Sequence, residues 1–241
     1  MNYFIAALRV EIYKLRRSLV PWLTLLFVMA VVSQEVGQPD WHSYLSGAVY
    51  RFTILGSIGF GFLTSWLFGR EYADRTLKDL LALPVSRLNM VLAKYAAVLV
   101  SCVLISVVLF VYVLGLGMIV GLPGLSVDMI WQAFGVFGLT AVFNMLLCTL
   151  VAFIACWSRG WLAPIGFVFL TLVSALILGP SPVGPYVPWA IPALQTLHFS
   201  SGGTGMAGVG ILHGASYTIL LVTGAVGFAG TLAWWRYTDQ R

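Results

Sequence analysis

Charged residues are scarce in this chain. Only 9% of its 241 residues are Asp, Glu, Lys or Arg, whereas 60% are hydrophobic. A soluble domain carries about 25% charged residues, so the composition excludes an ordinary soluble protein. The net charge of +5 does not require a nucleic-acid partner, because basic loops collect on the cytoplasmic side of membrane proteins.

The sequence also lacks the groups that several chemistries require. It has no G-x-x-x-x-G-K-[ST] phosphate loop, so it does not hold nucleotide in that way. No carboxylate lies near the middle of an apolar run, and ion-coupled carriers usually need one there. Cys102, Cys148 and Cys156 show no metal-binding spacing, and we interpret them as packing residues. The sequence therefore offers no catalytic residue, no metal site and no cofactor of its own.

Long apolar runs are what the chain does contain. A helix needs roughly 20 mostly apolar residues to cross about 30 Å of hydrocarbon, and the short alternating strands of a membrane barrel are not seen. The sequence therefore predicts an all-α integral membrane protein with one transmembrane domain over residues 1–241. Six spans are expected at about 19–36, 48–69, 88–120, 130–157, 161–179 and 207–235.

Basic residues predict the orientation of these spans. When the loops are assigned alternately to two sides, one side receives all but one of the thirteen Lys and Arg residues, and the other receives only Arg51. The basic side is expected to be cytoplasmic. Both termini are therefore predicted to be cytoplasmic, which requires an even number of spans. The basic set is Arg9, Lys14, Arg16, Arg17, Arg70, Arg75, Lys78, Arg87, Lys94, Arg159, Arg236 and Arg241.

The N-terminal segment 3–17 is predicted to form an amphipathic elbow helix. Phe4, Leu8, Ile12 and Leu15 recur at helical spacing. Such a helix would lie along the inner membrane face and turn into the first span at Pro21. An ordinary basic anchor that favours anionic lipid is the alternative. The charged residues of the elbow are Arg9, Glu11, Lys14, Arg16 and Arg17.

A second amphipathic helix is predicted over 71–83, between the second and third spans. One face carries Ala73, Leu77, Leu80 and Leu81, and the opposite face carries Glu71, Arg75, Lys78 and Asp79. Glu71 with Arg75 and Asp74 with Lys78 are expected to pair at i, i+4, and Pro84 ends the helix. A topology signal needs only basic residues, whereas acids and bases alternate here. We therefore interpret the helix as a docking surface for a soluble partner; a simple connector is the alternative.

The same segment resembles a motif of the ABC transporter type-2 permeases, a group that includes the bacitracin-export and lantibiotic-immunity permeases. Their loop between the second and third spans is similar to E-Y-x-x-G-T-x-K-x-L-L-x-x-P-x-S-R. This chain departs from it at Arg75, where glycine is frequent. The matching residues are Glu71, Tyr72, Thr76, Leu77, Lys78, Leu80, Leu81, Pro84, Val85, Ser86 and Arg87, with Lys94 beyond them. The E-x-x-K of Glu11 and Lys14 and the Y-x-P-W of Tyr186, Pro188 and Trp189 are also similar.

The resemblance implies a permease subunit without enzymatic activity, in the plasma membrane of a prokaryote. Its coupling helix would dock on a separate ATPase through Glu71, Tyr72, Arg75, Thr76, Leu77, Lys78, Leu80, Leu81, Pro84 and Arg87. Two ATPase copies, which bind ATP and Mg, would assemble with two permeases as a homodimer or a heterodimer. The implied activity is export of an amphipathic or hydrophobic compound, such as an antimicrobial peptide or drug.

Two other classes remain open from the residues alone. One is a carrier or channel driven by an ion gradient, and the other is a membrane assembly or sensor protein that moves no substrate. His213 is expected within the sixth span, as a packing residue or as a proton or metal group. The proline-rich segment 180–192 excludes a straight helix and is expected to form an interfacial connector or a partial outer cap. Small-xxx-small pairs at Ser57/Gly61 and Gly210/Gly214 predict close helix packing.

Overall fold

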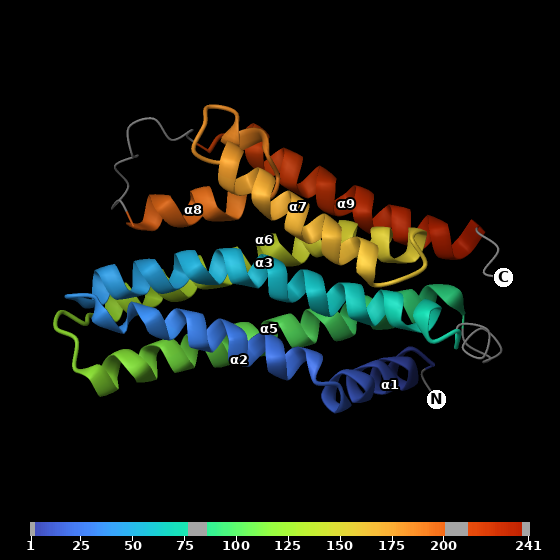
Figure 1. The fold of residues 1–241 in the computed structure, drawn as a ribbon, viewed down its shortest axis with the longest axis horizontal. Helices are drawn as coiled ribbons and strands as arrows, with labels where there is room; N and C mark the ends of the chain where they lie inside the picture. The colour runs from blue at the N-terminus through green and yellow to red at the C-terminus, as the bar shows by residue number, and fades with distance from the viewer. Residues whose placement is uncertain (1–2, 77–85, 201–211, 238–241) are drawn as a thin grey trace.

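The computed structural model describes residues 3–76, 86–200 and 212–237, and all regular structure within them is helical. The long helices run side by side as one bundle, and α1 and the last turns of α9 lie at the same end of it (Figure 1). We call this end, which also holds Arg70, Arg87 and Arg236, the basic end. The elements are α1 (Tyr3–Arg17), α2 (Val20–Val32), η1 (Ser33–Gly37), α3 (Trp41–Ala73), α5 (Arg87–Val120), α6 (Val127–Trp157), α7 (Leu162–Leu178), η2 (Gly184–Tyr186), α8 (Ile191–Ser200) and α9 (Gly214–Tyr237).

Five helical segments of the described chain are long and apolar enough to cross a membrane. They are Val20–Gly37, α3, α5, α6 and α9. The predicted run at 161–179 forms α7, which has 17 residues and is about 26 Å long at 1.5 Å per residue. Five of the six predicted spans thus correspond to helical segments of sufficient length, and the fifth predicted span, 161–179, is a shorter apolar helix.

The second span begins earlier than its predicted start at residue 48. Asp40 caps α3 because its side chain accepts a hydrogen bond from the backbone N–H of Ser43 at 2.9 Å. His42 and Ser43 lower the hydropathy of this first turn, but Trp41 and Tyr44 on either side of them are buried. The segment predicted as an outer loop is therefore largely helical.

Helix α3 lies at the centre of the bundle. The most apolar 18-residue stretch of α3 is 72% buried, compared with 39% for that of α5 and 28% for that of α9. Helix α3 packs against α2, α5, α6, α7 and α8. Helices α5 and α9 therefore present much of their apolar surface outward, as helices in contact with lipid do.

Close helix contacts depend on glycine at several positions, of which Gly227 and Gly61 are examples. A Cβ atom at Gly227 of α9 would overlap the backbone of Thr149 and Leu150 in α6. A Cβ at Gly61 of α3 would lie 2.6 Å from Cγ2 of Val168 in α7, so the predicted close approach at Gly61 is confirmed. At Gly214 no atom of the described residues lies within 4 Å of a Cβ built there, so they show no close approach at that position. Gly210 lies outside the described residues.

The end opposite the basic end holds the one basic residue predicted for the outer side. Arg51 of α3 forms an ion pair with Glu35 of η1, and its Nη1 atom donates a hydrogen bond to Oε1 of Gln34 at 3.0 Å. The Glu35 side chain is 7% exposed, so Arg51 balances a nearly buried carboxylate. Within the proline-rich segment, Gly184–Tyr186 forms η2, and the short helix α8 begins at Ile191.

Candidate functional site

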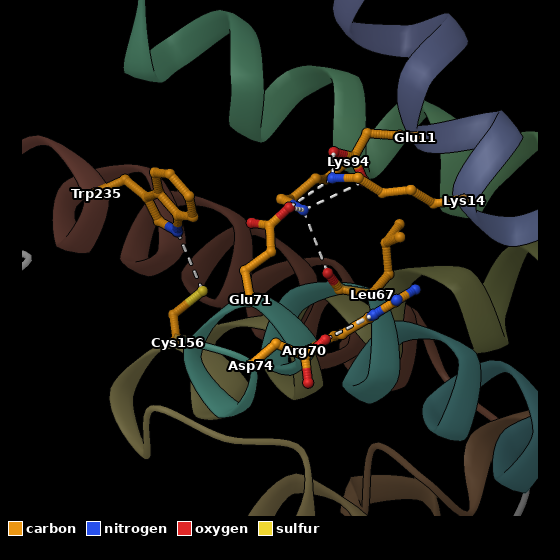
Figure 2. A network of polar contacts seen from close by, with 9 residues as sticks. All are labelled: Glu11, Lys14, Leu67, Arg70, Glu71, Asp74, Lys94, Cys156 and Trp235. Carbon is orange, nitrogen blue, oxygen red and sulfur yellow. Dashed lines mark hydrogen bonds and ion pairs between the residues drawn. The ribbon is translucent and has the colours of Figure 1, made fainter. Parts of the chain in front are cut away.

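Four charged side chains meet where α1, α3 and α5 come together at the basic end (Figure 2). We call Glu11, Lys14, Glu71 and Lys94 the charge cluster. The Nζ atom of Lys14 lies 2.8 Å from Oε1 of Glu11 and 2.7 Å from Oε1 of Glu71. The Nζ atom of Lys94 lies 2.9 Å from Oε1 of Glu71 and 3.2 Å from Oε2 of Glu11. Each lysine therefore contacts both carboxylates.

The positions of these residues in their helices explain why they meet. Glu11 and Lys14 are three residues apart and share one face of α1. Glu71 lies in the last turn of α3, and Lys94 lies two turns after the start of α5. Because α3 ends and α5 begins at the basic end, both side chains lie at the level of α1. Both form ion pairs with residues of α1.

The cluster is buried and electrically balanced. The side chain of Lys94 is 1% exposed, and those of Glu11 and Glu71 are 6% and 7% exposed. Lys94 also donates to the carbonyl oxygen of Leu67 at 3.3 Å. An unpaired charge in such a place is strongly destabilising, so the two lysines and two glutamates stabilise one another.

Lys14 is the most exposed member, at 28%. Burial alone would lower the pKa of Lys14, but the nearby carboxylates of Glu71 and Glu11 outweigh it and raise that pKa above its usual value of 10.5. Lys14 is therefore charged at neutral pH. One oxygen of the cluster, Oε2 of Glu71, is buried and has no hydrogen-bond partner among the described residues.

The end of α3 corrects the predicted helix over 71–83. Glu71, Tyr72 and Ala73 belong to the last turn of α3 and do not begin a separate helix. The backbone N–H of Thr76 donates to the carbonyl of Glu71, and that of Arg75 donates to the carbonyl of Tyr72. These two bonds terminate the helix as a Schellman motif does, with the residue at Arg75 in the left-handed region. Arg75 has φ +57°, a conformation that favours glycine.

The ion pairs predicted for this segment also differ. Arg70 pairs with Asp74 at 3.0 Å, with both side chains about half exposed, whereas Glu71 is turned toward Lys14 and Lys94. The expected Glu71–Arg75 pair is therefore wrong, because packing of α3 against α1 and α5 sets which face of α3 is buried. The expected pair of Asp74 with Lys78 involves a residue outside the described chain.

The structure separates the residues predicted to dock on an ATPase into three groups. Glu71 is buried in the charge cluster, and Tyr72 beside it is half-buried. Arg75 and Thr76 are exposed. Arg87 is exposed at the start of α5, where its Nη1 atom donates to the carbonyl oxygen of Trp235 at 3.3 Å. Leu77, Lys78, Leu80, Leu81 and Pro84 lie outside the described residues. The docking role of the set stays a prediction.

Helix α1 has the same range, residues 3–17, as the predicted elbow helix. Its position along the membrane face stays a prediction. Arg9, Arg16 and Arg17 are exposed, as expected for a basic face. The buried face differs from the predicted stripe, because Glu11 is buried whereas Ile12 is 36% exposed. Sequence reasoning assigned Glu11 and Lys14 to the elbow and Glu71 to docking, and did not predict that they form one cluster with Lys94.

Two further polar features lie away from the cluster. Asn144 of α6 is 1% exposed and accepts a 2.6 Å hydrogen bond from Oγ of Ser57 in α3. His213 lies just before α9 and is exposed, so its predicted place inside the last span is wrong. Its backbone N–H donates to Oγ of Ser216 at 3.3 Å, which contributes to the start of α9.

Several long apolar helices and a charge cluster confined to one end of them define a multi-pass membrane protein. A family model described as ABC-2 family transporter protein matches residues 7–175. The chain belongs to this family and is an ABC-2 type permease. The matched region contains all four residues of the charge cluster.

A curated relative supports the same family. The bacitracin transport permease protein BCRB of Bacillus licheniformis is 28% identical over 143 residues, which cover 59% of this chain and 68% of that protein. As a member of this permease family, the chain is the membrane subunit of an ABC transporter, and membership implies association with an ATPase subunit.

Proposed function

We propose that the chain exports an amphipathic or hydrophobic compound with energy from ATP, which is hydrolysed with Mg on a separate ATPase subunit. Two permease copies and two ATPases form the transporter in the plasma membrane of a prokaryote, with the basic end in the cytoplasm. The name of the curated relative directs the choice of substrate toward antimicrobial peptides such as bacitracin. The absence of a phosphate loop from the sequence agrees with an ATPase on another chain.

The charge cluster is the observation that supports this function best. The segment between Thr76 and Ser86 joins the end of α3 to the start of α5, and Glu71 and Lys94 lie close to its two ends. Both side chains are ion-paired to α1. A force applied to that segment by an ATPase therefore reaches α1, α3 and α5 together. This gives the proposed docking segment a physical connection to the spans and to the elbow.

The docking surface is proposed to consist of Arg75, Thr76 and the segment 77–85. Glu71 is buried in the charge cluster and contributes indirectly, through its ion pairs with Lys14 and Lys94. Arg75 is exposed and outside the charge cluster, so its charge can be changed without breaking buried ion pairs. Charge reversal at Glu71 would instead place an extra buried cation beside two lysines. Arg75 is therefore the better residue for a test of docking.

The test uses the chain co-expressed with its cognate ATP-binding cassette protein and reconstituted in liposomes. Arg75→Glu should weaken co-purification of the ATPase and uncouple ATP hydrolysis from bacitracin transport. Arg9→Glu makes the same charge change on the exposed face of α1 and should leave both unchanged. Full coupled transport by Arg75→Glu would count against the docking role.

The same preparation separates the other two classes. Transport by the purified chain alone, without ATPase or ATP, would establish a gradient-driven carrier or channel. ATP hydrolysis by the complex that no substrate stimulates would favour a membrane assembly or sensor protein.

A further inference from the structure

A groove of about 790 Å³ lies at the basic end between the start of α5 and the last turns of α9. Its walls are apolar and include Leu88 and Val91 of α5 and Leu232 and Ala233 of α9. Arg87 and Arg236 are the charged residues in its lining. The described part of this groove therefore combines hydrocarbon walls with two positive charges and no acid.

The two arginines are available to a ligand. Neither forms an ion pair with a carboxylate of the described residues, and both are exposed. The Nη1 atom of Arg87 donates to the carbonyl oxygen of Trp235 across the groove, and the guanidinium of Arg236 lies 5.3 Å from the ring centroid of Tyr237. These contacts hold both side chains beside the groove and leave further N–H donors without a partner among the described residues.

The groove lies at the level where two candidate spans end. Arg87 is the first residue of α5 and Arg236 is the penultimate residue of α9, and both helices are long and apolar enough to cross a membrane. Leu88 is 54% exposed and Tyr237 is 76% exposed, so the walls continue into the outward-facing apolar surface. Aromatic residues and arginines at span ends lie at the depth of lipid headgroups.

We propose that this groove binds an anionic phospholipid, with its headgroup phosphate between Arg87 and Arg236 and an acyl chain along Leu88 and Ala233. Guanidinium groups suit phosphate because they present several N–H donors in a fixed plane. The cytoplasmic leaflet, which we expect at the basic end, is the one that carries anionic lipid. This site is distinct from the exposed basic face of α1 and assigns Arg87 to lipid rather than to the ATPase.

The test uses the purified full chain in detergent without any ATPase. Native mass spectrometry measures binding of dioleoyl-phosphatidylglycerol and of dioleoyl-phosphatidylcholine to the wild type and to the double variant R87Q/R236Q. Because each basic side chain near a headgroup contributes roughly a fivefold gain in affinity, the wild type should prefer phosphatidylglycerol by about 25-fold. The double variant should lose this preference.

The matched control is R9Q/R16Q, which removes two exposed arginines from α1 at the same end of the bundle. It should retain the preference. A233W adds bulk to the groove wall without changing charge, and it should weaken binding of phosphatidylglycerol even if R87Q/R236Q proves too unstable to purify.

Four outcomes would overturn the proposal. R87Q/R236Q could retain the preference for phosphatidylglycerol. R9Q/R16Q could lose as much of that preference as R87Q/R236Q, which would indicate a general charge effect. Glycerol 3-phosphate could bind as tightly as phosphatidylglycerol, which would show that the apolar walls contribute nothing. Loss of a permease dimer from R87Q/R236Q, in place of lipid loss, would identify the groove as an interface between two copies.

Discussion

The Nζ atom of Lys94 lies 2.9 Å from Oε1 of Glu71, and this pair joins the two helices that flank the proposed docking segment. The lysine side chain is 1% exposed and the glutamate side chain is 7% exposed. Neither charge could be solvated by water if the other were removed. The pair therefore fixes the end of α3 against the start of α5 for as long as both groups are charged.

Loss of one charge from the cluster should be costly. Glu71→Gln leaves two lysines facing one carboxylate, and breaking a buried pair in this way typically costs about 3–5 kcal/mol. Denaturation in mixed detergent and sodium dodecyl sulfate micelles measures the free energy of unfolding. Asp74→Asn breaks the exposed pair with Arg70 and should cost less than about 1 kcal/mol.

Restoring the charge balance should recover part of that stability. Glu71→Gln combined with Lys14→Gln leaves one lysine and one glutamate in the cluster. The double variant should therefore lose at least about 0.5 kcal/mol less than the sum of the two single losses, as for residues in one ion-pair network. Strict additivity in the double-mutant cycle would contradict a shared cluster.

The left-handed backbone at Arg75 predicts a stabilising substitution. Arg75→Gly removes the steric cost of this conformation for a residue with a Cβ atom, partly offset by the greater freedom of glycine in the unfolded chain, with a net gain of about 0.5–1 kcal/mol. Arg75→Ala separates the backbone effect from loss of the charge. If the free energy of unfolding of Arg75→Gly is no higher than that of Arg75→Ala, the strain argument at this position fails.

The contact of α9 with α6 should not tolerate a methyl group at Gly227. Gly227→Ala places that methyl against the backbone of Thr149 and Leu150, and overpacking of this kind typically costs about 1–3 kcal/mol. Gly135→Ala is the control, since that glycine is in the same bundle with open space around it, and it should be neutral or slightly stabilising. Equal melting temperatures of the two variants in detergent would contradict the close approach.

The three cysteines should be inaccessible in the folded protein. Cys102 and Cys156 are 0% exposed and Cys148 is 4% exposed, and Cys156 accepts a hydrogen bond from Nε1 of Trp235 at 3.2 Å. A hydrophilic maleimide should label none of them until the protein is denatured. Ser158→Cys, at the exposed end of α6, should be labelled at once, and full labelling of the native wild type would contradict the burial.

Apolar runs predicted most helices well, because hydropathy reports directly on burial in lipid. The prediction of 88–120 differs from α5 by one residue, and that of 130–157 differs from α6 by three. Hydropathy did not predict the start of α3 at Trp41, because polar residues in its first turn lower the mean hydropathy there. Only the packing of that turn and its Asp40 cap reveal it.

The charge cluster was only half predictable. Glu11, Lys14, Glu71 and Lys94 were each recognised from motifs, but their meeting depends on how α1 lies against α3 and α5, which no local pattern specifies. The inward direction of Glu71 has the same origin. The left-handed position of Arg75 explains why the family motif has glycine there, and a steric argument from that glycine could have found the end of α3.

The 17 residues of α7 have a consequence for the surrounding lipid. A helix of about 26 Å is shorter than a hydrocarbon core of about 30 Å, and such a mismatch is relieved by local thinning of the bilayer, at a cost that grows with each ångström. As the predicted fifth span, α7 should therefore make the permease sensitive to acyl-chain length, with higher stability in thin bilayers than in thick ones.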